Sequence, residues 1–242
     1  MNRLMNTWHY LRNNGVIPTL KHALYRMSEL KNDRYFGIET NNDVKLETLG
    51  IHNGDSAQYS PISYAALKLA LREVEPLPEN EAFLDYGAGK GRVLIVAATL
   101  PFRRIVGVEF APELVSVARH NIKHARYCLT DSNIEILERD ATEYDVPANI
   151  SVIHFYNPFI GNTLSTVTEN IASSLRANPR QMTILFANPD DFERILQEEN
   201  RIPREWIIKT KDIPWPYFKQ DAPYSNSYRI YSLDSRKPAN QT

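Results

Sequence analysis

The chain has 242 residues, of which 43% are apolar and 24% charged, and its formal net charge is -1. This length and composition can bury a full core, so we expect one globular domain with an extension. The charge balance supplies no broad electrostatic field for attracting nucleic acid or anionic lipid, which leaves local patches as the alternative. The single cysteine, Cys128, excludes an intramolecular disulfide and a cysteine-rich zinc site. No metal site is expected.

No apolar run approaches the roughly 20 residues that span a bilayer. The first ten residues also lack the apolar core of a secretory signal. We therefore expect a cytoplasmic protein without integral membrane association.

Residues 1–30 carry apolar side chains at helical spacing, interrupted by Asn13-Asn14-Gly15 and by Pro18. This pattern predicts two short amphipathic helices, with Leu20, Leu24 and Met27 on the apolar face of the second. The charged residues before Glu29 are all basic: Arg3, Arg12, Lys21 and Arg26. We favour a helix that packs on the main domain with its charges solvated; a surface for an acidic partner or a membrane is the alternative.

Residues 31–60 look irregular apart from a possible strand at 44–47, and we place the boundary between extension (1–58) and main domain (59–242) here. Ser60-Pro61 resembles an N-cap with a first-turn proline and predicts a helix over 61–74. Strand and helix patterns then alternate, which favours a doubly wound, mainly parallel sheet covered on both faces. The predicted strands are 82–86, 104–109, 134–138, 151–156, 181–187, 205–212 and 227–233, and the predicted helices are 91–99, 112–125, 162–176 and 190–199.

The strand Phe83-Leu-Asp85-Tyr ends in glycines at 87, 89 and 91, and an apolar helix follows. A strand, a glycine turn and a helix in this order bring backbone N–H groups and a helix N-terminus against a ligand. The dinucleotide fingerprint requires G-x-G-x-x-G, whereas this spacing is G-x-G-x-G. The sequence therefore disfavours a nicotinamide cofactor.

An acid two residues before G-x-G-x-G is the first motif of the class I S-adenosylmethionine-dependent methyltransferases, which the chain resembles from about residue 83 to residue 233. The resemblance implies seven strands, six parallel and the last antiparallel, and S-adenosylmethionine as cofactor. It implies that Asp85 orders the glycine loop and meets the amino-acid moiety of the cofactor, while Gly87 and Gly89 leave room for its close approach.

The next two strand ends supply the remaining cofactor contacts of the family. Glu109 ends the second strand, where a carboxylate can accept both ribose hydroxyls, and Phe110 would lie against the adenine. Asp140-Ala141 follows the third strand and matches the adenine contact, with the carboxylate accepting from the exocyclic amine and a backbone N–H serving a ring nitrogen. Core packing for Phe110 and a turn or cap role for Asp140 are the alternatives.

The fourth strand runs into Asn157-Pro158-Phe159, which resembles the (Asn/Asp)-Pro-Pro-(Tyr/Phe) signature of methyltransferases that act on amino groups but lacks its second proline. The resemblance implies that the Asn157 carboxamide and the Pro158 carbonyl accept N–H bonds of the acceptor, with Phe159 as a platform. A strand-end turn is the alternative for Asn157. His154, earlier in the same strand, is better interpreted as a satisfied core histidine than as a general base.

Two further segments are predicted to shape the pocket. Tyr59-Ser-Pro61 is similar to a segment that closes over the cofactor in the non-SET protein lysine methyltransferases, and the aromatic loop 213–226 suits a substrate wall or simple packing. We expect a methyltransferase acting on an amine of a protein lysine or a small molecule. A nucleic-acid N-methyltransferase, a cofactor-binding scaffold without turnover and, last, a nicotinamide oxidoreductase are the alternatives. The acceptor, the number of methyl groups added and the oligomeric state stay open.

Overall fold

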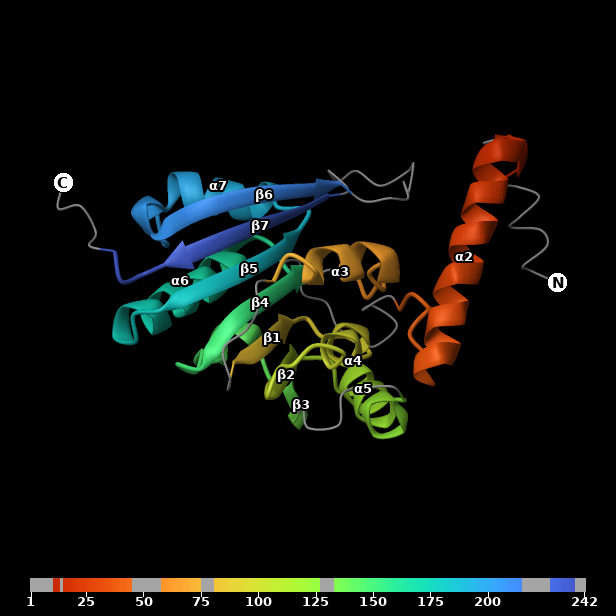
Figure 1. Ribbon diagram of the computed structural model, residues 1–242, viewed down its shortest axis with the longest axis horizontal. Coiled ribbons are helices and arrows are strands. Elements are labelled where there is room, and N and C mark those ends of the chain that lie inside the picture. Colours follow the sequence, from red (N-terminus) through yellow and green to blue (C-terminus); the bar gives the residue numbers. More distant parts are fainter. Residues whose placement is uncertain are drawn as a thin grey trace.

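The structure is a computed structural model that describes residues 11–13, 15–44, 58–74, 81–126, 133–214 and 227–237. A seven-stranded sheet has the order β3-β2-β1-β4-β5-β7-β6, in which β7 is antiparallel to both neighbours and the other strands are parallel (Figure 1). The predicted doubly wound α/β sheet with a reversed last strand is confirmed. Its strands are β1 (Ala82–Tyr86), β2 (Arg104–Glu109), β3 (Asn133–Glu138), β4 (Ile150–Tyr156), β5 (Gln181–Ala187), β6 (Ile207–Pro214) and β7 (Ser227–Asp234).

The strand order reverses between β1 and β4, which lie side by side in the middle of the sheet. The register pairs Asp85 of β1 with Gly107 of β2 and with His154 of β4. In an open α/β sheet the crevice beyond the carboxyl ends of the strands at such a reversal is the usual ligand site. The topology therefore brings the ends of β1, β2, β3 and β4 to one place.

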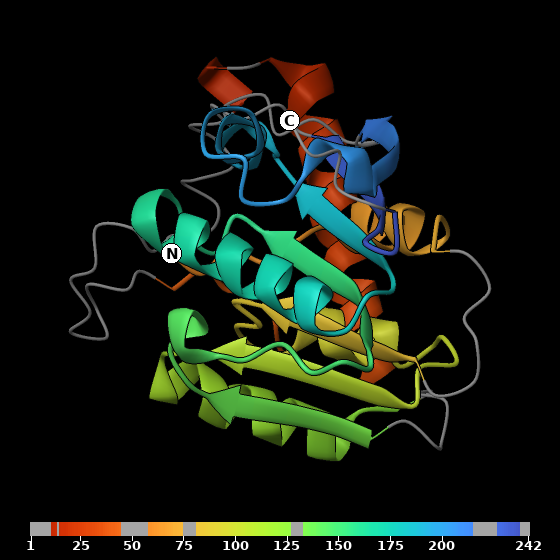
Figure 2. The ribbon, with the colours of Figure 1, turned by 90° about the vertical axis from the view of Figure 1, so that its left-hand side faces the viewer.

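Helices cover both faces of the sheet, and each face has its own apolar core. In Figure 2, α6 lies in front of the sheet and α5 behind it. One core includes side chains of α3, α4 and α5, and the other includes those of α6 and α7. These helices are α3 (Tyr64–Leu71), α4 (Arg92–Ala97), α5 (Pro112–His124), α6 (Gly161–Ala177) and α7 (Asp190–Glu198).

The amino-terminal part differs from the prediction. One helix, α2 (Val16–Phe36), spans 21 residues after Gly15, so the predicted break at Gly15 is present but Pro18 does not end the helix. Proline is tolerated in a first turn because the N–H it lacks would have no partner there. Leu20 is 59% exposed and Met27 is 66% exposed. The helix does pack on the main domain, but through Glu29, Asp33 and Phe36 instead of these apolar side chains.

Helix α3 is shorter than predicted, beginning at Tyr64 after Ser63 rather than at Pro61. The residues before it are extended, and Tyr59 forms an antiparallel bridge with Val44. Only the first residue of the possible strand 44–47 is described. Cys128 and most of the loop 213–226 also lie outside the described residues.

Candidate functional site

A cavity of about 930 Å³, including its part open to solvent, lies at the carboxyl ends of the central strands. It brings together side chains from the ends of β1, β2, β3 and β4 with the segment that precedes α3. Ten of the eleven predicted site residues line it, and only Gly89 does not. The ten are Tyr59, Asp85, Gly87, Glu109, Phe110, Asp140, Ala141, Asn157, Pro158 and Phe159.

The glycine turn after β1 is left-handed at Gly87 (φ 69°) and Gly89 (φ 53°). A Cβ on Gly87 would lie 2.3 Å from Pro158 Cβ, and one on Gly89 would lie 2.4 Å from the Tyr59 ring. These glycines therefore do more than leave room for a ligand. They let the turn pack directly on Pro158 and Tyr59, which belong to two other walls of the cavity.

Asp85, the residue before the last of β1, belongs to a buried chain of polar contacts. Its Oδ1 is 2.7 Å from His154 Nδ1, and His154 Nε2 is 2.7 Å from the Tyr228 hydroxyl. Burial raises the pKa of Asp85, and the contact with His154 opposes this shift. The structure confirms His154 as a satisfied core histidine, because both ring nitrogens are occupied and the side chain is 0% exposed.

The second oxygen of Asp85 has no hydrogen-bond partner among the described residues, although it is buried. An unpaired buried acceptor costs about 1–3 kcal/mol. Because Asp85 lines the cavity, this unpaired oxygen is the candidate acceptor for a donor group on a ligand.

Glu109 is the last residue of β2, and its carboxylate links the glycine turn to the end of β2. Its Oε2 accepts from the Gly89 N–H at 2.9 Å and its Oε1 accepts from the Ala111 N–H at 3.0 Å. Burial raises the pKa of Glu109, and these backbone N–H groups oppose the shift. The structure thus gives Glu109 the contact to the loop that the resemblance implied for Asp85, which bonds His154 instead.

Asp140 follows β3 and is exposed at the rim of the cavity. Its Oδ1 accepts from Thr142 N–H at 2.8 Å and from Thr142 Oγ1 at 2.7 Å, capping the short 3₁₀ turn Ala141–Glu143. The sequence leaves a capping role and an adenine contact open for Asp140. The geometry accommodates both, because Oδ2 is not used in the cap.

Asn157 continues β4 with a left-handed backbone (φ 42°), and its carboxamide has no hydrogen-bond partner among the described residues. A non-glycine residue in this region is uncommon, although asparagine tolerates it best. Phe159 is 6% exposed and packs edge-on against Tyr86 and Phe155, each with centroids 6.1 Å away. Most of its ring therefore belongs to the core, which limits it as a platform.

A second Asn-Pro pair ends the neighbouring strand β5, and the sequence reasoning did not use it. Asn188 also has a left-handed backbone (φ 55°) and is 7% exposed. Its side-chain oxygen is buried and has no partner among the described residues. Two adjacent parallel strands are thus followed by the same Asn-Pro dipeptide. This repetition in the sequence could have identified Asn188 as a candidate site residue.

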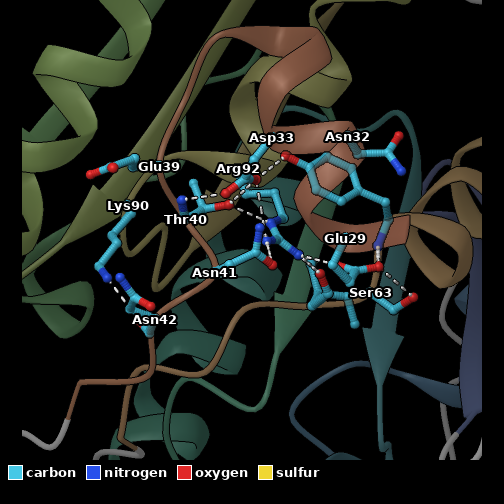
Figure 3. A network of polar contacts seen from close by, with 12 residues as sticks. Glu29, Asn32, Asp33, Glu39, Thr40, Asn41, Asn42, Ser63, Lys90 and Arg92 are labelled. Atoms are coloured by element: carbon cyan, nitrogen blue, oxygen red, sulfur yellow. Dashed lines mark hydrogen bonds and ion pairs between the residues drawn. The ribbon is translucent and has the colours of Figure 1, made fainter. Parts of the chain in front are cut away.

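The sequence reasoning also missed Arg92, the first residue of α4, which lines the cavity and is 3% exposed. Figure 3 shows its polar contacts with the residues around it. Its Nη1 donates to Glu29 Oε2 at 2.6 Å and to the Ile62 carbonyl at 2.5 Å. Its Nε donates to Thr40 Oγ1 at 2.7 Å. Its guanidinium lies 4.2 Å from the centre of the Tyr64 ring.

Two buried acids of α2 face this arginine. Asp33 Oδ1 lies 3.4 Å from Arg92 Nη2, and the Asp33 carboxylate also accepts from the Thr40 N–H at 2.8 Å and the Tyr64 hydroxyl at 2.6 Å. Burial raises the pKa of Glu29, and Arg92 opposes the shift. Buried charges require such pairing. The extension is therefore anchored to α4, the helix that starts at the glycine turn. Two acids four residues apart in α2 were the feature of the sequence that could have indicated this contact.

The wall formed by Tyr59 is fixed by the same segment. The Tyr59 hydroxyl donates to the Thr40 carbonyl at 2.9 Å, and burial raises the pKa of this tyrosine. Lys90 places its Nζ 4.8 Å from the centre of the Tyr59 ring and donates to the Asn42 carbonyl at 2.7 Å. Residues 40–42 thus hold this wall against the glycine turn.

The described residues contain no group of three or more histidine, cysteine, aspartate or glutamate side chains placed to hold a metal ion. In the same part of the chain, no helix has both the length and the apolar character needed to cross a membrane.

Comparisons with known proteins agree with this geometry. A family model described as a methyltransferase domain matches residues 77–221, more than half of the chain. A ribosomal protein L11 methyltransferase from Thiobacillus denitrificans is 42% identical over 60 residues, 24% of this chain and 20% of that protein. The match thus spans about a fifth of that relative's length.

Solved structures of methyltransferases are similar to this chain. A precorrin-6y C5,15-methyltransferase from Geobacter metallireducens has a TM-score of 0.51 and 16% identity, with 74% of this chain and 92% of that chain covered. An RNA methyltransferase from Salinibacter ruber in complex with S-adenosyl-L-homocysteine has a TM-score of 0.47 and 19% identity, with 75% and 97% covered. The first of these likenesses supports the fold.

The cavity suits S-adenosylmethionine on its own chemistry. The free Asp85 oxygen matches an ammonium donor, the buried Glu109 carboxylate matches ribose hydroxyls, and the left-handed turn at Gly87 has no side chain on the cavity side. Together with the family match, these features lead to one conclusion. The chain belongs to the class I S-adenosylmethionine-dependent methyltransferases.

Proposed function

We propose that this methyltransferase modifies an amine nitrogen of a protein lysine or a small molecule. The observation that carries the proposal is the position of Asn157-Pro158. The pair lines the cavity, and Pro158 packs directly on Gly87 of the cofactor turn. An acceptor held by these residues would lie next to the turn that is proposed to hold the cofactor.

The proposed roles in cofactor binding follow the strand ends. Asp85 would accept from the amino group, Glu109 from the ribose hydroxyls, and Asp140 with Ala141 would contact the adenine, with Phe110 beside it and Tyr59 covering the turn. When bound, S-adenosylmethionine supplies a methyl group on a positively charged sulfur. The protein's part is then to orient the acceptor and exclude water.

The Asn157 carboxamide oxygen and the Pro158 carbonyl would each accept an N–H bond from the neutral amine and so direct its lone pair. A general base is not required at the transfer step, because the neutral amine attacks with its own lone pair and the aliphatic ammonium product keeps its proton until it is released to solvent. Neighbouring groups are poor bases: His154 is bonded at both nitrogens, and burial raises the pKa of Tyr156 so that it stays protonated.

Two observations support a protein or small-molecule acceptor over a nucleic acid. The net charge of -1 offers little attraction for a polyanion. The curated relative from Thiobacillus denitrificans is named for methylating a ribosomal protein.

The test is transfer of a labelled methyl group from S-adenosylmethionine to cell lysate, followed by separation into protein, metabolite and RNA fractions. We expect label in an amine of the protein or metabolite fraction. Asn157→Ala should lower turnover while leaving the cofactor-induced rise in thermal stability unchanged. Label confined to RNA would refute the acceptor class, and unchanged turnover of Asn157→Ala would refute the role of Asn157.

A further inference from the structure

Helix α2 turns an apolar stripe away from the rest of the protein. We define the apolar stripe as Val16, Ile17, Leu20, Leu24 and Met27, whose exposed fractions lie between 57% and 72%. Spacings of three and four residues place them on one face of the helix. Exposed contiguous apolar surface of this kind usually marks an interaction site.

The outward orientation of the apolar stripe is fixed by the opposite face. Glu29 and Asp33 lie on that face and pair with Arg92 in the interior, and Phe36 is 1% exposed. Rotating the helix to bury the apolar stripe would expose Phe36 and break both ion pairs. The polar face therefore holds the helix to the domain while the apolar stripe stays outside.

Charge gives the second and independent observation. The exposed charged residues of α2 are all basic: Lys21, Arg26, Lys31 and Arg34. Lys21 borders the apolar stripe, and Lys31 and Arg34, four and seven residues after Met27, continue its line along the helix. Both acids of the helix are buried. An apolar face flanked by cations is typical of a helix that lies in the interface of an anionic bilayer.

We propose that α2 docks on an anionic lipid bilayer, with the apolar stripe at the boundary between headgroups and acyl chains and the flanking cations on lipid phosphates. Figure 1 shows α2 at one end of the molecule, with its first turns extending beyond α3. This position leaves the apolar stripe accessible to a flat surface.

A second copy of the chain fits this surface less well. Pairing two apolar stripes would bring the cationic flanks of the two helices together, and like charges facing one another at an interface are unfavourable. An anionic surface instead satisfies the apolar and the basic residues at once. Because α2 also holds Arg92 in the cavity wall, docking would fix the orientation of the catalytic domain relative to the bilayer.

The experiment is co-sedimentation of the full chain with vesicles of phosphatidylcholine and phosphatidylglycerol in equal parts, and with vesicles of phosphatidylcholine alone. We expect binding to the first that weakens with added salt. Leu20→Glu with Leu24→Glu should abolish it. Lys21→Gln with Lys31→Gln should weaken partitioning about 25-fold, from about fivefold for each charge.

The control is Ile208→Glu on β6, a residue that is 43% exposed and far from α2 in the fold; it should bind vesicles as the wild type does. Thermal unfolding with and without cofactor verifies that each variant is folded. Absence of wild-type binding, or equal binding by the Leu20/Leu24 variant, overturns the proposal. The proposal is also overturned if the wild type is a dimer that binds no vesicles and the Leu20/Leu24 variant is a monomer, since the apolar stripe would then join two copies of the chain.

Discussion

Replacing Arg92 by methionine should destabilise the protein severely, because it removes a buried charge but leaves its partners in place. Methionine fills much of the same volume, yet Glu29 (4% exposed) would lose its 2.6 Å contact to Nη1 and Asp33 (6% exposed) its contact to Nη2. Breaking a buried ion pair by removing one partner costs about 3–5 kcal/mol. For a chain of this size that corresponds to about 6–20 °C in Tm.

Asp33 keeps other donors, including Thr40 and the Tyr64 hydroxyl, so we expect most of the loss to come from Glu29. Adding Glu29→Gln to Arg92→Met should therefore recover about 1–2 kcal/mol, because it neutralises the stranded carboxylate. The measurement is the free energy of unfolding in urea for the wild type, the single variant and the double variant.

The matched control is Arg104→Ala, which breaks an ion pair with Glu135 of similar geometry (2.9 Å) but with side chains 35% and 40% exposed. Exposed pairs contribute at most about 1 kcal/mol. If Arg92→Met costs no more than Arg104→Ala, or if Glu29→Gln restores nothing in the double variant, the reasoning about the buried network is refuted.

Three further predictions concern the cofactor turn, the rim and pH. Asp140→Ala should weaken S-adenosylmethionine binding in isothermal titration by about 1–3 kcal/mol, whereas Glu143→Ala in the same 3₁₀ turn should not; equal affinities would reject the adenine contact. Gly89→Ala should lower Tm and cofactor affinity more than Gly15→Ala does. Both glycines have a positive φ, but only a Cβ at position 89 would clash with the Tyr59 ring. Similar losses in the two variants would mean that backbone strain alone matters. A hydrogen bond from Arg236 lowers the pKa of Asp234 from 3.8 to about 2, so the stabilisation that this contact gives the folded state is present above pH 3.8 and is lost as the pH falls towards 2. Asp234→Asn should therefore be less stable than the wild type near neutrality, and the difference in the free energy of unfolding should shrink between pH 3.8 and pH 2. A difference that stays constant with pH would contradict the assignment.

The sheet could be predicted because its strands are short apolar runs bounded by turn residues. The predicted ranges 82–86, 104–109 and 181–187 match β1, β2 and β5 as the structure has them. The ligand end of the sheet followed from topology, which is why acids at successive strand ends could be grouped before any contact was known.

The extension could not be predicted in the same way, because its inner face is polar. Periodicity assigns the apolar side of a helix to the core, whereas α2 buries Glu29 and Asp33 against an arginine about sixty residues later in the chain. A pattern within one segment carries no information about such a partner. Helix α3 was predicted too long because it, too, meets a partner that is distant in sequence. The Ile62 carbonyl accepts a hydrogen bond from Arg92, and the helix begins only after it, at Tyr64.

The cavity residues were found by type and position, but their contacts were not. Glu109 rather than Asp85 holds the glycine turn, and the Phe159 ring is mostly in the core. Which of two nearby carboxylates reaches a loop depends on register and side-chain direction, and these become visible only once the strands are assembled.

The buried arginine network has a practical consequence for anyone preparing a shortened version of this protein. A cut at residue 58, where the sequence places the start of the main domain, would discard both carboxylates opposite Arg92 and the residues that brace Tyr59. The trimmed product would keep every cofactor motif yet carry an orphaned cation in its interior. Expression trials should therefore begin no later than Gly15, so that the whole of the long helix stays with the catalytic portion.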